Sequence, residues 1–108
     1  MEFLEDPGFT SRVLRLLGEE DYAELQNHLT DHPQAGALIP GGKGLRKIRW
    51  ALPGRGKRGG SRVIYYWHVR PEIITFFDIY AKNQKEDLTK QELRQLTQIL
   101  EELIHELD

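Results

Sequence analysis

The sequence contains no cysteine among its 108 residues, which excludes disulfide bonds and thiolate metal sites. It has no apolar run near the roughly 18 residues that a membrane-spanning helix requires. The opening residues, MEFLEDPGFT, are acidic and contain no apolar stretch, so we expect no secretory signal peptide there. These absences favour a cytoplasmic protein without membrane attachment, and the length predicts a single domain over residues 1–108.

Aspartate and glutamate are absent between Pro33 and Pro71, although the chain has 17 acidic residues in all. The net charge of -2 therefore conceals a strongly basic segment. A run of one charge sign is ordinarily just a solvated face, but an acid-free stretch of this length favours a surface that binds a polyanion. Its basic residues are Lys43, Arg46, Lys47, Arg49, Arg55, Lys57, Arg58, Arg62 and Arg70.

Two helices are predicted before this segment. Asp6 and Pro7 are suited to the N-cap and first position of a helix that ends at Gly18. A second helix is predicted from about residue 19 to residue 32, where Pro33 ends it. The apolar residues of both recur at the spacing of one helical face.

Three strands are predicted in the middle of the chain, over residues 45–51, 61–69 and 72–81, because β-branched and aromatic residues concentrate there. They form an antiparallel meander. Residues 34–44 contain four glycines and a proline and are predicted to be a loop, and residues 52–60 a basic, glycine-rich turn. A further short strand is suggested at residues 1–4.

A long C-terminal helix is predicted after Thr89, which forms a capping box with Glu92. The order of elements indicates an α+β fold, and we expect its helices on one face of the small sheet.

Several familiar chemistries are excluded by spacing. The Gly-Lys dipeptides lack the remaining residues of a phosphate-binding P-loop, and no serine lies in a nucleophile elbow. His28 and His32 are four residues apart on a helix, but no third metal ligand accompanies them, so we expect no metal site.

The candidate site lies in the basic meander. Strand alternation places Lys47 and Arg49 on one face of their strand. Adjacent antiparallel strands then bring them beside Arg62, Tyr80 and Lys82, next to a glycine-rich turn whose backbone can approach a phosphate. Any one of these residues alone is most simply an ordinary surface residue. Together they predict a cationic cluster.

The stretch GGKGLRKIRWALPGRGKRGGSRVIYYWHV, followed by DIYAKNQKEDLTKQEL, resembles the HigB-type toxins of the RelE/ParE superfamily of type II toxin–antitoxin systems. The resemblance covers residues 41–97 approximately. It implies a RelE-like fold, with a small antiparallel sheet, two N-terminal helices and a C-terminal helix.

The resemblance also implies a ribosome-dependent endoribonuclease that cleaves mRNA in the ribosomal A site and so inhibits translation. The 2′-OH attacks the adjacent phosphate, which requires a base, an acid and cations but neither a metal nor another cofactor. By motif position Lys47 acts on the phosphate or in proton transfer, and Arg62 stabilises the developing charge. Tyr80 and Lys82 stack on a base or move a proton. Contacts to RNA are assigned to the remaining basic residues, which are Lys43, Arg46, Arg49, Arg55, Lys57 and Arg58.

The implied partners are mRNA on the ribosome and a helix-turn-helix HigA-type antitoxin, with operator DNA bound only through that antitoxin. Three alternatives stay open at this point: a ParE-like toxin that poisons gyrase, a non-catalytic RNA-binding module, and a protein-interaction domain whose basic face docks an acidic partner. A helix-turn-helix protein encoded beside this one favours a toxin over the last two.

Overall fold

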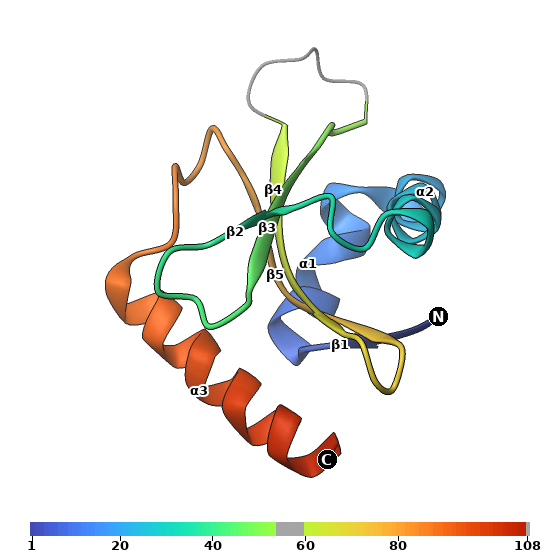
Figure 1. Cartoon of the computed structure of the whole chain (residues 1–108). Helices are drawn as coiled ribbons and strands as arrows, with labels where there is room; N and C mark the ends of the chain where they lie inside the picture. The colour runs from blue at the N-terminus through green and yellow to red at the C-terminus, as the bar shows by residue number, and fades with distance from the viewer. Residues whose placement is uncertain (54–59, 108) are drawn as a thin grey trace.

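The computed structural model describes residues 1–53 and 60–107. A five-stranded sheet lies between α3 on one side and α1 and α2 on the other (Figure 1). The elements in chain order are β1 (Glu2–Glu5), α1 (Pro7–Leu16), α2 (Gly18–Asp31), β2 (Ala37–Leu38), β3 (Arg46–Trp50), β4 (Ser61–His68), β5 (Ile73–Ala81) and α3 (Lys90–Leu107).

The strand order in the sheet is β1-β5-β4-β3-β2. The antiparallel meander β3–β4–β5 confirms the predicted central strands. Two further strands enlarge the sheet. The short N-terminal strand β1 pairs with β5 in parallel, so the sheet is mixed. The two residues of β2 pair with β3 inside the stretch that was predicted to be a loop.

Both faces of the sheet are covered by helices, so the expectation of helices on one face was wrong. Val63 and Tyr65 of β4 pack with residues of α1 and α2, whereas Ile64 packs with Leu100 of α3. The physical reason is that successive side chains of β4 are buried from Ser61 to Tyr65, so both faces of the strand are covered.

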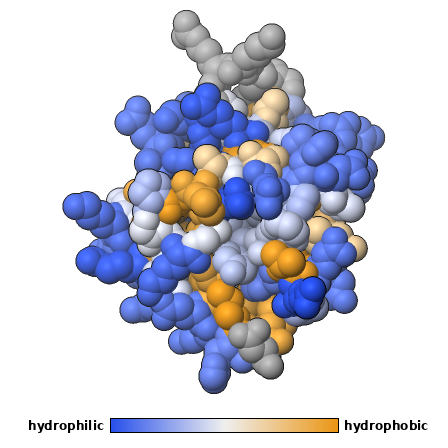
Figure 2. All heavy atoms as spheres, in the orientation of Figure 1, coloured by the Kyte–Doolittle hydropathy of each residue, from blue (hydrophilic) through white to orange (hydrophobic). Residues whose placement is uncertain are grey.

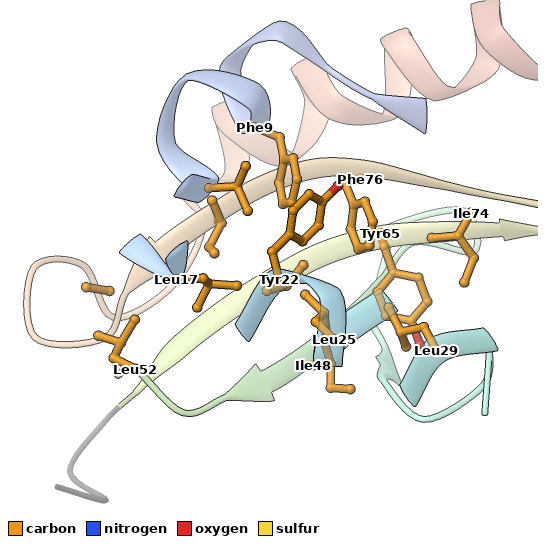
Figure 3. Close-up of a cluster of buried hydrophobic side chains, with 14 residues drawn as sticks. Phe9, Leu17, Tyr22, Leu25, Leu29, Ile48, Leu52, Tyr65, Ile74 and Phe76 are labelled. Carbon is orange, nitrogen blue, oxygen red and sulfur yellow. The ribbon is translucent and has the colours of Figure 1, made fainter. Parts of the chain in front are cut away.

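The larger core lies between the sheet and the first two helices (Figure 3). Phe9 of α1 stacks on Phe76 of β5 with 4.7 Å between ring centroids, and Tyr22 of α2 meets Phe76 edge-on. This aromatic contact fixes α1 and α2 on the sheet and leaves the opposite face to α3.

The predicted helix ends are confirmed. The side chain of Asp6 accepts a hydrogen bond from the backbone N–H of Gly8 at 3.0 Å. Gly18 has a φ of +77° where the chain turns from α1 into α2, a conformation that favours glycine. The capping box of α3 is formed in both directions, since each of Thr89 and Glu92 accepts from the other's backbone N–H, at 3.0 and 2.8 Å.

A β-bulge interrupts the pairing of β4 with β5. Ile64 pairs with Asp78 and Tyr65 pairs with Phe76, so Phe77 is an extra residue on β5. An extra residue reverses which side chains of a strand face which side of the sheet.

The bulge determines where Tyr80 points. Phe76 packs on the α1 and α2 side, and without the bulge Tyr80, four residues later, would share that side. Instead Ile79 faces α1 and α2, and Tyr80 faces α3. Tyr80 thereby joins the face that also holds its β4 partner, Arg62.

Candidate active site

Three polar residues form a row across the meander. Arg49 of β3 pairs with Arg62 of β4, and Arg62 pairs with Tyr80 of β5. Paired residues of neighbouring antiparallel strands point to the same face of a sheet. Arg49 is exposed, whereas Arg62 and Tyr80 are 8% and 7% exposed. The row thus runs from an open end at β3 to a buried tyrosine at β5.

Lys47 is joined to this row by a carboxylate that the sequence analysis did not identify. Oδ1 of Asp87 accepts a hydrogen bond from Nζ of Lys47 at 3.1 Å. The same oxygen lies 3.5 Å from the hydroxyl of Tyr80. Asp87 therefore links β3 to β5 across the width of β4.

The protonation of these groups follows from their surroundings. Burial alone would raise the pKa of the Asp87 carboxyl, but hydrogen bonds from the Leu88 N–H and from Lys47 outweigh it and hold the pKa below its usual value. Burial, and then the negative charge of Asp87, raise the pKa of Tyr80 to about 12, although Arg62 opposes the shift. At neutral pH Asp87 is ionised and Tyr80 keeps its proton.

Two lysines of the connection between β5 and α3 border Tyr80. Lys82 continues the strand by one backbone hydrogen bond to Gly60, and its Nζ donates to the carbonyl of Glu86 at 3.3 Å. The Nζ of Lys85 lies 5.2 Å from the centroid of the Tyr80 ring and also pairs with Glu92. One face of the Tyr80 ring is therefore covered by a cation.

Arg62 is held at the start of β4 by local contacts. Its Nη1 donates to the carbonyl of Ser61 at 3.2 Å, and the hydroxyl of Ser61 donates to the carbonyl of Trp50 on β3 at 2.8 Å. These bonds connect the guanidinium to the ends of both strands, beside the glycine-rich turn.

The structure thus brings Lys47, Arg49, Arg62, Tyr80 and Lys82 to one face and one end of the meander, in the arrangement predicted from strand alternation. We call this set, with Asp87, the cationic cluster.

Two of the residues assigned to RNA contacts lie elsewhere. Arg46 lies on the opposite face of β3, where its Nη1 donates to the carbonyl of Gly36 at 2.8 Å and fastens the preceding loop. Lys43, in that loop, pairs with Glu101 of α3. Arg55, Lys57 and Arg58 lie outside the described residues.

The histidines take no part in the cluster. His28 packs against His32 and Trp50, with ring centroids 5.2 and 5.5 Å away, and Nε2 of the buried His68 is 3.0 Å from the hydroxyl of Thr75. Within residues 1–53 and 60–107 no group of three or more histidine or acidic side chains is arranged to hold a metal ion.

Asp87 and Lys85 are the residues of the site that sequence reasoning missed. Both lie in a polar connection that offers no strand or helix periodicity. The available signal was position, since Asp87 lies two residues before Thr89, the first residue of the capping box of α3, and a capped helix start holds nearby side chains in place.

The face of the molecule seen in Figure 2 is mostly hydrophilic, and apolar residues form separate groups on it. Among the described residues, no helix has both the length and the apolar character to cross a membrane.

Residues 28–107 of the chain match the sequence model of a protein family, which is described as the RelE toxin of the RelE/RelB toxin–antitoxin system. The protein belongs to the RelE toxin family. It is therefore the toxin of a toxin–antitoxin pair, and its family implies a cognate antitoxin. The matched region of this RelE toxin family member contains the whole cationic cluster.

Proposed function

We propose that this toxin is a HigB-type, ribosome-dependent endoribonuclease that cleaves mRNA in the ribosomal A site and thereby inhibits translation. The observation that supports it most is the row of Arg49, Arg62 and Tyr80 beside Lys47. That row combines positive charge with a proton donor on one face of the sheet, and it is open to solvent at its Arg49 end. RelE family toxins are generally endoribonucleases, which makes RNA the natural ligand of such a face.

The proposed reaction is attack of the RNA 2′-oxygen on the adjacent phosphorus. The new P–O2′ bond closes a 2′,3′-cyclic phosphate as the P–O5′ bond breaks. The 2′-OH proton passes to the nitrogen lone pair of a lysine that has first lost its own proton, for which Lys47 and Lys82 are the candidates. The leaving 5′-oxygen gains a proton and departs as a hydroxyl. This chemistry uses no metal or other cofactor.

Arg62 is proposed to stabilise the charge that develops on the phosphorus oxygens. A guanidinium presents two parallel N–H donors that match two phosphate oxygens, and it stays charged throughout. Its low exposure supports this role, because a hydrogen bond in a site shielded from water is worth more than one at an open surface.

Tyr80 is proposed to donate the proton to the leaving oxygen. Its raised pKa keeps the hydroxyl protonated at neutral pH, which suits an acid rather than a base. Its burial and the Lys85 ammonium over its ring argue against the alternative role of stacking on an RNA base.

The experiment that tests this function compares a translated mRNA with the same RNA in the absence of ribosomes. The purified toxin should cleave the translated message far faster and leave cyclic phosphate and 5′-hydroxyl ends, because a chain of this size has little surface to position RNA alone. Equal rates on both substrates would indicate a free ribonuclease. Inhibited gyrase with intact mRNA would indicate a ParE-like toxin instead.

The cognate antitoxin is proposed to be a helix-turn-helix, HigA-type protein that binds operator DNA and brings the toxin to it. We favour steric inhibition, with the antitoxin on the side of α1 and α2. The first turn of α2 contains Glu19, Glu20 and Asp21, and a partner bound there leaves the cationic cluster open. A short RNA analogue of the A-site codon should then still bind the toxin–antitoxin complex. Loss of that binding would indicate that the antitoxin covers the cluster directly.

A further inference from the structure

One carboxylate lies within the cationic cluster, between Lys47 and Tyr80, the groups proposed to transfer protons at the reacting phosphate. A single oxygen of Asp87 is 3.1 Å from Nζ of Lys47 and 3.5 Å from the hydroxyl of Tyr80. A phosphate oxygen held by the same two groups has to take the same place, because a tyrosine hydroxyl has only one proton to donate. Asp87 and an RNA phosphate are therefore alternative occupants of one position.

Of the three side chains in this contact, that of Asp87 can move most easily. Tyr80 is 7% exposed and lies in β5, and Lys47 lies in β3. The Asp87 side chain is 64% exposed and belongs to the connection between β5 and α3, outside any strand or helix. Rotation of this side chain into solvent breaks the contacts of its Oδ1 with Lys47, Tyr80 and the Leu88 N–H, and it opens the position without a change in the sheet.

The charge of Asp87 is maintained where it opposes RNA. Its pKa is held below the usual value by the Leu88 N–H and by Lys47 despite partial burial, so the carboxylate is ionised at neutral pH. An ionised carboxylate beside a phosphate is a like-charge contact, and like charges at contact distance disfavour each other.

We propose that Asp87 is a specificity-determining residue: an internal anion that fills the phosphate position between Lys47 and Tyr80 until a firmly positioned RNA phosphate displaces it. The inference rests on the proposed ribonuclease function and identifies the RNA that the site accepts. For free RNA at low concentration, the free energy needed to displace the carboxylate weakens binding in full. An mRNA held on the ribosome presents its phosphate at a high effective concentration, so the need to displace Asp87 slows cleavage of this mRNA little.

The test measures binding of a short RNA oligonucleotide with a 2′-deoxy residue at the cleavage position, which binds but cannot react. Asp87→Asn removes the charge and keeps an oxygen that accepts from the Leu88 N–H, a bond of 2.8 Å in the wild type. We expect this variant to bind the oligonucleotide about 2- to 5-fold more tightly, the size of one partly exposed ion pair. It should also cleave free RNA faster by a similar factor, and the gain on free RNA should exceed any gain on translated mRNA.

The matched control is Glu86→Gln, which removes the same charge one residue away. Glu86 meets Lys82 through its backbone carbonyl, which the substitution preserves. This control should change affinity by less than about 1.5-fold, because an exposed charge without the contact is screened by salt. In a Lys47→Met background, Asp87→Asn should lose most of its effect.

Three results would overturn the inference: Asp87→Asn binding no more tightly than Glu86→Gln, the full gain persisting without Lys47, or a fall in kcat at unchanged KM, which would make Asp87 a participant in the reaction. Each of these results can be told apart from a result that contradicts the ribonuclease function itself. If the wild type and Glu86→Gln neither bind the oligonucleotide nor cleave translated mRNA, the ribonuclease function is wrong and the inference falls with it.

Discussion

Arg62 is the cation most enclosed by the fold among the residues proposed to act on the phosphate. It lies between Arg49 and Tyr80 and is 8% exposed. Its planar guanidinium presents parallel N–H donors that match two phosphate oxygens, and its place in the middle of the row favours a role in binding an anion.

Arg62→Ala should therefore reduce cleavage of translated mRNA by about 100- to 1,000-fold, the usual effect of removing one donor from an oxyanion site. Single-turnover cleavage at equal protein concentration measures it. Arg70→Ala is the control, since Arg70 is an exposed arginine of the same acid-free segment in the turn after β4. Full activity of Arg62→Ala would show that the assigned site is wrong.

Tyr80 is distinguished by its hydroxyl rather than by its ring. Tyr80→Phe should lower the cleavage rate by about 100-fold or more, because the leaving oxygen loses its proton donor. The control is Tyr66→Phe, which removes a hydroxyl from β4 on the same face of the sheet as Tyr80. It should leave the rate within about 2-fold of wild type.

The pH dependence gives a second check on the same residue. A donor with a pKa of about 12 keeps its proton as the pH rises from about 7 to about 10, so Tyr80 should cause no loss of rate over that range. A wild-type rate that falls through this range, while that of Tyr80→Phe does not, would contradict the assignment.

At the scale of elements, sequence reasoning located the strands of the meander and all three helices to within a few residues. Composition and periodicity are local properties, and β4 and the capping box of α3 are encoded locally. The bulge at Phe77 is not, because it exists only in the pairing of β5 with β4. The two residues of β2 were missed for the same reason, since their strand character comes from pairing with β3.

The start of α3 also fixes the approach to the site, because Asp87 precedes it by three residues. Thr89→Ala should lower the free energy of unfolding by about 1 kcal/mol, the typical cost of losing an N-cap. Chemical denaturation measures this. Thr30→Ala is the control, since Thr30 lies within α2 and its hydroxyl bonds only to the carbonyl one turn earlier among the described contacts. Equal effects of the two substitutions would mean that the cap contributes nothing specific.

The capping box adds a pH dependence of known sign. Hydrogen bonds from Lys85 and from the Thr89 N–H hold the pKa of Glu92 below its usual value. A depressed carboxyl pKa stabilises the fold above the unfolded value and loses that contribution as the pH falls through the folded one. Wild type should therefore lose stability below about pH 4.5 more steeply than Glu92→Gln. If stability fell equally steeply with pH in the two proteins, the hydrogen bonds of Glu92 would not contribute as expected.

Across the whole molecule, the basic and acidic parts of the sequence are brought into contact. Two lysines of the acid-free segment pair with acids from the C-terminal part of the chain, Lys43 with Glu101 and Lys47 with Asp87. Composition predicted a basic surface, but it did not predict that acidic residues of the same chain partly neutralise that surface. Nor did it predict that Arg46 turns away to fasten a loop, because side-chain partners far apart in sequence depend on the folded arrangement.

The central claim is that one face of this sheet cleaves mRNA on the ribosome. Mapping of mRNA 5′-ends after induced expression tests it most directly, with wild type and Arg62→Ala produced in equal amounts in the same host. We predict new 5′-hydroxyl ends at codons within translated frames, arrest of translation, and loss of both in Arg62→Ala. Growth arrest without new ends, or identical ends from the two proteins, would contradict the account.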